Sequence, residues 1–207
     1  MGEFSYHELY MKRLFLFCLG PVILIACSGP SNSNANQEVY NTDFNWAITI
    51  PEGFENVDAK EWARLQGRGS EAIENATGQE IENLATDIFV VRSGQTNYME
   101  ANYQPFDEAV DGSYSDSNKA VNELLYETFI SQMPGIKIDS ASSVETISNL
   151  DFNVMKMKID YPNNMTMFFE MYTRLFDKKE FTLNIIYVDE KKGEQLREAW
   201  TKSRFGI

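Results

Sequence analysis

The sequence predicts an α+β fold: an antiparallel β-sheet with a C-terminal meander, flanked by about three helices. Four strand-like stretches follow one another between residues 136 and 188, separated only by short turn segments, which is the pattern of a β-meander. Apolar residues recur at helical spacing before and after the meander. Helices and strands mixed in this order favour an antiparallel sheet with helices packed against it.

The first predicted elements are a strand and a helix. Apolar residues alternate with polar or small ones over 44–50, as in a half-buried strand, and Pro51-Glu52-Gly53 ends it with a turn. Asp58, with Glu61 three residues on, resembles an N-cap. The helix that it opens carries Trp62, is interrupted or bent at 67–69, and fades near Gly78.

Two strands and a second helix are predicted next. Residues 87–92 are a short apolar run rich in β-branched residues. Residues 98–106 form another strand, in which Pro105 indicates an end or an edge. The tripeptide 115–117 offers N-caps for a helix that ends at Pro134-Gly135. Its apolar positions at helical spacing are Val121, Leu124, Leu125 and Phe129.

The meander and a last helix complete the predicted domain. The four strands are expected at 136–147, 150–161, 165–176 and 181–188. Asp189 then caps a helix that carries Leu196, Ala199 and Trp200. There is no internal repeat and no second linker, so residues 39–207 are interpreted as one domain with one core.

The N-terminal segment has the anatomy of an export signal. A basic pair, Lys12-Arg13, precedes an apolar run that is too short for a comfortable transmembrane helix, which needs about 20 residues. Residues 1–10 fit no part of a signal and are interpreted as an upstream extension, and 11–26 as the signal peptide. The run ends in a tetrapeptide that resembles the bacterial lipobox: Leu24, Ile25, Ala26 and Cys27.

The lipobox resemblance implies a lipidated Cys27 that tethers the mature protein to a membrane. At least a diacylglyceryl group is implied, and two acyl chains anchor a protein firmly. Residues 27–38 have no apolar periodicity and are interpreted as the lipidated cysteine and a flexible linker. Ser28 resembles the sorting signal for the outer membrane. The expected location is therefore the bacterial cell envelope, on the outer membrane facing the periplasm.

Composition excludes several classes of function. The net charge is −13, and long-range attraction to nucleic acid is not expected of an acidic protein. Cys18 lies in the signal core, and His7, the one histidine, lies upstream of it. The predicted mature domain therefore lacks the residues of Ser-His-Asp and Cys-His catalysis and of ordinary zinc sites. No cofactor is expected, and without disulfides core packing must supply the stability.

Two segments carry a family resemblance. The opening FNWAITIPEGF and the ending FTLNIIYVDEKKGEQLREAWTKSRF, with a helix and a meander between them, look like the PsbP/DcrB-like α-β-α sandwich proteins. The similarity spans roughly residues 40–205. That family includes exported lipoproteins and photosystem accessory subunits. The resemblance therefore implies scaffolding or binding rather than catalysis, and it carries over no catalytic residue.

A row of apolar side chains in the meander is a candidate binding face. Residues 155–161 and 165–171 present alternate positions to one side if their turn is tight. Methionines suit surfaces that accept varied apolar partners, and they also fill ordinary cores. This row is therefore interpreted either as an apolar binding surface or as a core face under a helix. Its members are Met155, Met157, Ile159, Tyr161, Met165, Met167, Phe169 and Met171.

Two motifs resemble ligand sites without meeting their requirements. The glycines at 67 and 69 match a loose dinucleotide fingerprint, but no strand runs into them. Asp107, Asp111 and Asp116 make an acidic loop that could hold a divalent cation weakly. Asn118 stands where a calcium loop needs a bidentate Glu. A solvated acidic loop is the simpler interpretation, and no metal site is assigned.

The functional expectation is a lipid-anchored, non-catalytic binding or scaffold module for an envelope protein or an apolar ligand. The alternative is an envelope hydrolase that uses paired carboxylates. Asp160, Glu170 and Asp189 sit on or beside predicted strands, but no spacing in the sequence brings two of them together.

Overall fold

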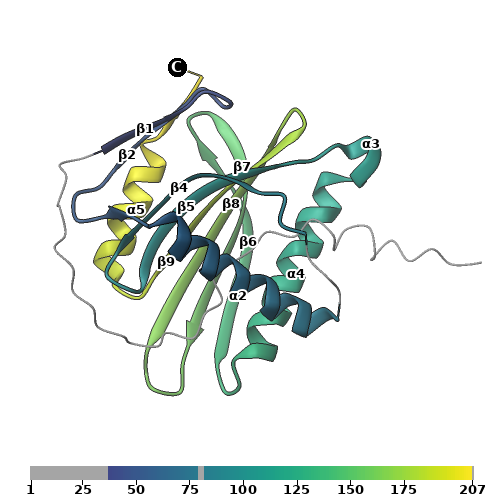
Figure 1. Ribbon diagram of the computed structural model, residues 1–207, viewed down its shortest axis with the longest axis vertical. Coiled ribbons are helices and arrows are strands. Elements are labelled where there is room, and N and C mark those ends of the chain that lie inside the picture. Colours follow the sequence, from purple (N-terminus) through teal and green to yellow (C-terminus); the bar gives the residue numbers. More distant parts are fainter. Residues whose placement is uncertain (1–36, 79–81, 207) are drawn as a thin grey trace, which may run out of the picture.

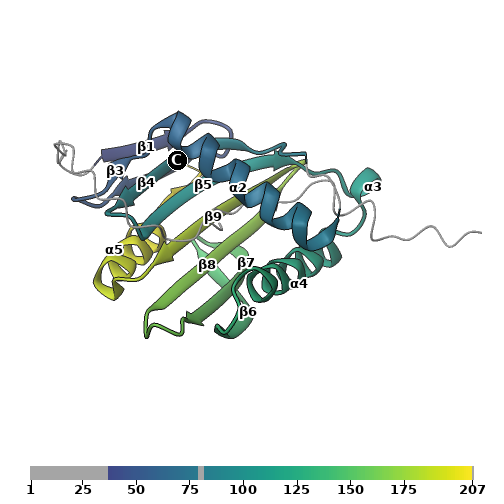
Figure 2. The same cartoon turned by 60° about the horizontal axis from the view of Figure 1, so that its bottom comes forward.

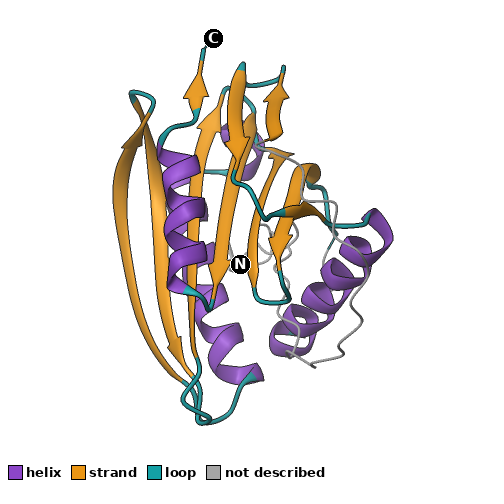
Figure 3. Cartoon of the chain, turned by 90° about the vertical axis from the view of Figure 1, so that its left-hand side faces the viewer, coloured by secondary structure: helices purple, strands orange, loops and turns teal. Residues whose placement is uncertain are grey.

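The computed structural model describes residues 37–78 and 82–206. They form two antiparallel sheets and four helices, one of which, α3 (Glu108–Asp111), is a single turn. The α+β class with an antiparallel sheet is confirmed. Figure 1 shows the long strands of the larger sheet side by side, with α2 crossing them. Figure 3, coloured by secondary structure, shows the helices lying against the strands.

The larger sheet contains the predicted meander. Its strands run in the order β3-β4-β5-β9-β8-β7-β6, and every neighbouring pair is antiparallel. Tight turns join the four meander strands, with Ser148, Asn149, Asn164 and Asp177 at positive φ, a conformation that Asn and Asp tolerate better than most residues. The strands are β3 (Glu55–Asn56), β4 (Thr86–Ser93), β5 (Asn97–Pro105), β6 (Lys137–Ile147), β7 (Leu150–Asp160), β8 (Thr166–Phe176) and β9 (Lys179–Tyr187).

One face of this sheet is covered by a small second sheet and by α5 (Glu190–Thr201). The small sheet has the order β1-β2-β10, from β1 (Gln37–Asn41), β2 (Trp46–Ile50) and β10 (Arg204–Phe205). Trp46 and Trp200 are both fully buried, and the ring centroid of Trp46 lies 4.9 Å from that of Phe181 on β9. Aromatic packing thus joins the two ends of the described chain to the centre of the sheet.

The opposite face is covered by α2 (Ala59–Thr77) and α4 (Tyr114–Gln132), which Figure 2 shows near one another on that side. Ile73 of α2 and Val121, Leu125 and Phe129 of α4 form a second apolar cluster with side chains of β7 and β8. Asp58 caps α2 as predicted, its carboxylate accepting from the backbone N–H groups of Lys60 and Glu61.

Several local predictions were wrong. Helix α2 is continuous through 67–69, since helical packing tolerates the loss of propensity at two glycines. The N-cap of α4 is Ser113 rather than any residue of 115–117. Pro105 is the last residue of β5, so the predicted strand end is confirmed there, and only the alternative of an edge is wrong, because β5 pairs on both sides. The expected domain boundary at residue 39 falls inside β1, which begins at Gln37, and β1 and the short elements β3, β10 and α3 were not anticipated.

We expect Gly193→Ala to destabilise the fold. A Cβ at this position of α5 would lie 2.4 Å from Cδ2 of the Tyr187 ring, and overpacking of this kind costs about 1–3 kcal/mol of unfolding free energy. The matched control is Gly67→Ala in α2, where a Cβ would meet nothing within 4 Å. Higher helix propensity should raise stability there by up to about 1 kcal/mol. Equal effects of the two substitutions in urea titrations would contradict this packing.

Candidate functional site

The outer edge of β6 is an open edge of the larger sheet in the described part of the chain. This strand ends the order of the larger sheet and pairs only with β7 among the described elements. Every side chain from Asp139 to Val144 is exposed, and Val144 is 62% exposed. The pairing with β7 is regular over the whole strand. Figure 2 shows β6 at the margin of the sheet, beside α4.

Strand β6 also lacks the usual protection of an edge. Proteins blunt edges with bulges, prolines or central lysines, because free N–H and C=O groups otherwise pair with another chain. The central residues 140–144 are Ser-Ala-Ser-Ser-Val, which carry no charge, and no proline or bulge interrupts the strand. We call this strand and the two grooves beside it the β6 surface.

The first groove lies between β6 and α4, with a volume of about 560 Å³. Ser140 and Ser142 form its β6 wall, and Asn153 and Met155 form part of its floor. The helix contributes polar and charged side chains, including Lys119, whose Nζ lies 4.0 Å from Oε1 of Glu123. The groove is therefore polar at its rim and reaches the edge of the apolar core at Met155.

The second groove, of about 400 Å³, lies on the other face of the same strand, between β6 and Arg197 of α5. Its floor holds Glu170, which is 4% exposed. Glu170 accepts hydrogen bonds from Tyr172 Oη at 2.8 Å, from Tyr187 Oη at 3.1 Å and from Arg197 at 2.9 Å. A buried carboxylate needs such partners, and these bonds fix Arg197 in the groove wall.

Burial and the charge of Glu170 raise the pKa values of the two neighbouring tyrosines. Burial raises the pKa of the Tyr187 phenol to about 12, and the neighbouring Glu170 carboxylate adds to the shift. Burial likewise raises the pKa of Tyr172. Both phenols therefore stay protonated and act as hydrogen-bond donors to Glu170 near neutral pH. The two phenols thus help to hold the buried Glu170 carboxylate in place.

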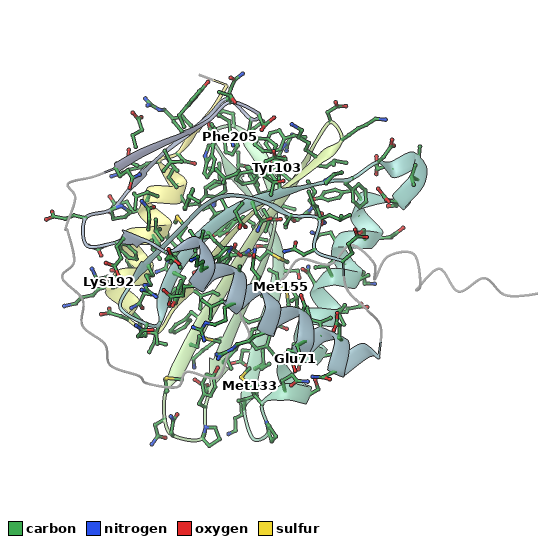
Figure 4. All side chains as sticks on the ribbon, in the orientation of Figure 1. Glu71, Tyr103, Met133, Met155, Lys192 and Phe205 are labelled. Carbon is green, nitrogen blue, oxygen red and sulfur yellow. The ribbon has the colours of Figure 1, made fainter. Side chains whose placement is uncertain are left out.

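The predicted methionine-rich face is interior. Met155, Met157, Ile159, Phe169 and Met171 are each at most 3% exposed and pack against Ile73 and the apolar side of α4. Met155 lies between the sheet and α4, near the middle of Figure 4. Tyr161, Met165 and Met167 at the end of the hairpin are partly buried. Of the two interpretations left open by the sequence, the open binding face does not hold for the five buried residues, because α4 covers them.

Two buried glutamates on β5 and β9 were not anticipated. Glu100 is 4% exposed and accepts from Asn184 Nδ2 at 2.7 Å, and Glu180 is 5% exposed and accepts from Gln104 Nε2 at 2.9 Å. Burial raises the pKa of each carboxyl to about 7. In the register of β5 with β9 they lie four positions apart, about 13 Å along the strands. Each carboxylate is held by a different amide side chain, so the two acids occupy separate sites in the sheet.

The other predicted acids have separate structural roles. Asp160 accepts from Thr166 Oγ1 at 2.6 Å, and Asp189 caps α5. In the acidic loop, Asp107 caps α3 and pairs with Lys178 at 2.6 Å, while Asp111 accepts from the backbone N–H of Asp107. Asp116 lies in the first turn of α4. Within residues 37–78 and 82–206, no group of three or more potential metal ligands comes together.

The predicted signal peptide, lipobox and most of the linker, Cys27 included, lie outside the described residues. Among the helices of the described part of the chain, none combines the length and the hydropathy needed to cross a membrane.

Comparison with known proteins supports the fold. No family model matches the chain, and no curated protein matches it. The solution structure of the PsbP protein of the cyanobacterium Synechocystis sp. PCC 6803 matches with a TM-score of 0.51 and 11% identity, over 88% of this chain and 98% of that one. The fold is PsbP-like.

A second solved structure is more distant. The crystal structure of LpqN, which is described as involved in cell envelope biogenesis of Mycobacterium tuberculosis, has a TM-score of 0.46 and 9% identity. It covers 82% of this chain and 90% of that one. At an identity of 11%, the PsbP likeness shows the fold alone, and this fold is the one that the sequence resemblance implied.

The sequence contained one sign of the β6 surface. Residues 139–143 lack the alternation of apolar and polar side chains that the other meander strands show, and a strand without a buried face is typical of a sheet edge. The buried glutamates gave no such sign, because β5 and β9 are buried on both faces and a sequence does not reveal which polar residues lie under a helix.

We expect the free energy of unfolding to fall as pH rises from about 4.5 to about 7. The raised pKa values of Glu100 and Glu180 mean that the folded state binds these protons more tightly than the unfolded state, and the advantage is lost as pH passes the folded pKa. Each carboxyl group accounts for up to about 3 kcal/mol of this fall in unfolding free energy. Glu100→Gln and Glu180→Gln should each flatten the fall, measured by urea titration at pH 5 and pH 8.

The control for this test is Glu198→Gln. Glu198 is exposed, and its ion pair with Lys202 lowers its pKa, so its removal cannot reduce a loss of stability at rising pH. If both buried variants kept the full pH dependence of the parent chain, the carboxyls of Glu100 and Glu180 would not be its source.

Proposed function

We propose that this protein is a lipid-anchored lipoprotein of the cell envelope whose folded domain is a non-catalytic binding or scaffold module. The open edge of β6, between two grooves, carries this proposal. Strand addition to such an edge uses main-chain hydrogen bonds for affinity and grooves on alternate sides for specificity. The β6 surface offers both: an outer edge along residues 139–144 that no described strand pairs with, and a groove on each face of the strand.

The anchor supports a role at a membrane surface. The lipobox ends in Cys27 and is followed by a polar tract up to residue 36. On this proposal the lipid is held in the outer membrane, and the tract lets the domain reach a partner in the periplasm. The partner is an envelope protein rather than a nucleic acid, which the net charge of −13 would repel.

Carboxylate-dependent hydrolysis is the second candidate function, and one observation favours it. Asp87 lies opposite Asn102 in the register of β4 with β5, and Asn102 is two positions along β5 from Glu100. Its charge adds to the raised pKa of Glu100, and burial raises the pKa of Asp87 as well. Neighbouring acids with raised pKa values are a feature of catalytic sites. Glu100 is enclosed at 4% exposure, and for that reason we rank this function second.

Contact between β6 and its partner can be tested by photocrosslinking in cells. A photoreactive amino acid replaces Val144 in one variant and Val110 in the control, because the two valines are 62% and 63% exposed. We expect discrete crosslinked products from position 144 and few from position 110, since only Val144 lies on the β6 surface. Equal yields at both positions, or none at 144, would remove the basis for assigning binding to this strand.

Lipid anchoring has its own test. We expect the Cys27→Ser variant to be absent from the membrane fraction and to accumulate as a soluble or precursor form, because it lacks the thiol that would carry the lipid. Fractionation with immunoblotting measures this, and Cys18→Ser in the predicted signal core serves as the control that should still be processed. A Cys27→Ser protein that remained a mature membrane protein would show that the lipobox interpretation is wrong.

A further inference from the structure

The exposed edge of β6 is complementary to itself. Its sequence, Lys-Ile-Asp-Ser-Ala-Ser-Ser-Val-Glu-Thr-Ile over Lys137–Ile147, has a cation near one end and an anion near the other. An antiparallel copy of the same strand reverses this order. A cation of one copy can then face an anion of the other at both ends of the paired segment.

Symmetry restricts the ways in which two copies can pair. Two identical antiparallel neighbours in one sheet are related by a two-fold axis perpendicular to the sheet, and directly opposed residues point to the same face. Odd-numbered residues of β6 share the face of α5, as the register of Glu145 with Phe152 shows, and even-numbered residues share the face of α4. Each residue must therefore face a partner of the same parity, so that the pairing centres on a single residue.

Centring on Ala141 gives the best match. Lys137 then faces Glu145 of the second copy, twice by symmetry, and Ile138 faces Val144, while the remaining opposed pairs place Asp139 at Ser143 and Ser140 at Ser142. Opposite charges and apolar pairs are the favourable cross-strand combinations. Val144, the 62% exposed valine, gains an apolar neighbour.

Neighbouring registers fit less well. Centring on Ser142 places Asp139 opposite Glu145, and like charges directly opposed are destabilising. Centring on Ser140 leaves Glu145 opposite Gly135, outside the strand, and moves Lys137 opposite Ser143. The charge pattern thus selects one register.

We infer that β6 pairs with β6 of a second copy of this chain, in the register centred on Ala141, so that the two seven-stranded sheets become one continuous sheet. The inference rests on the proposed function, because it names the partner that occupies the β6 surface. Residues 140–143 are small, uncharged and exposed, and the unbroken register with β7 keeps the edge regular. A dimer of this kind carries two lipid anchors, which holds it at the membrane more firmly than a single chain.

Disulfide trapping in the full chain tests the register. Opposed Cα atoms in an antiparallel pair lie about 4.5–5.5 Å apart, which a disulfide can span. Ala141→Cys is self-paired in the inferred register and should form a covalent dimer under mild oxidation. Ser143→Cys, on the same face, is the matched control. In the inferred register, residue 143 of one chain lies about 13 Å along the strand from residue 143 of the second chain. We expect about tenfold more dimer from position 141 than from 143.

Each possible result of the disulfide test either supports or overturns the inferred pairing of β6 with itself. The unsubstituted chain is run alongside to reveal any disulfide from Cys18 or Cys27. Dimer at 141 and little at 143 supports the inference, whereas dimer at neither position, or equal amounts at both, overturns it. Crosslinks from Val144 to a different protein without dimer at 141 would overturn self-pairing and leave binding at the β6 surface intact. No crosslink from Val144 would remove the proposed function as well.

Charge reversal gives an independent test. Lys137→Glu makes both ends of the edge negative, and Glu145→Lys makes both ends positive. In a dimer of either variant alone, residues 137 and 145 would face each other with like charges. Each variant alone should therefore be monomeric by sedimentation in detergent. An equimolar mixture restores an opposite pair at both ends and should dimerise. If the mixture stayed as monomeric as its components, or if the single variants dimerised like the parent chain, the inferred pairing would be wrong.

Discussion

The aromatic cluster around Trp46 is the contact on which the rest of the fold depends. Trp46 on β2 packs edge-on to Phe181, whose ring is stacked with Trp200 of α5, and Phe205 of β10 stacks on Trp46. The four residues come from both ends of the described chain and from its central strand. Residues 28–207 contain no cysteine and hence no disulfide, so burial of these rings holds the small sheet and α5 against the larger sheet. Figure 4 labels Phe205 and Tyr103, which lie at this end of the molecule.

This anchoring leaves the two faces of the larger sheet with different chemistry. The face under α5 is aromatic near the small sheet and becomes polar at Glu170, where Arg197 and two tyrosines surround the carboxylate. The face under α2 and α4 is apolar on β7 and β8 and polar on β5 and β9, where Glu100 and Glu180 are buried. Buried acids of this kind cost stability unless they bind a proton. Their retention makes the domain sensitive to pH without requiring catalysis.

The covering elements also determine where the molecule is open. α5 and the small sheet cover one face of the larger sheet, and α2 and α4 cover the other, but no described strand pairs with the outer edge of β6. The short strand β3 occupies the opposite edge with two residues. In the described part of the chain, the β6 side of the sheet ends in a strand of eleven residues, whereas on the other side β3 pairs with only Val91 and Arg92 of β4. On the proposed function, strand pairing along the edge of β6 joins the domain to a partner without any change in the fold.

The sequence by itself determined the α+β class, the meander, the caps of α2 and α5 at Asp58 and Asp189, and the absence of thiol and histidine chemistry from residues 28–207. These features are local: alternation, turn residues and residue types act within a few positions of the chain. Only the tertiary structure decided that the methionine face is interior, that Glu100 and Glu180 are buried, and that β6 is an edge. Each of these depends on which helix or strand lies across a face, and contacts between residues distant in the chain set that arrangement.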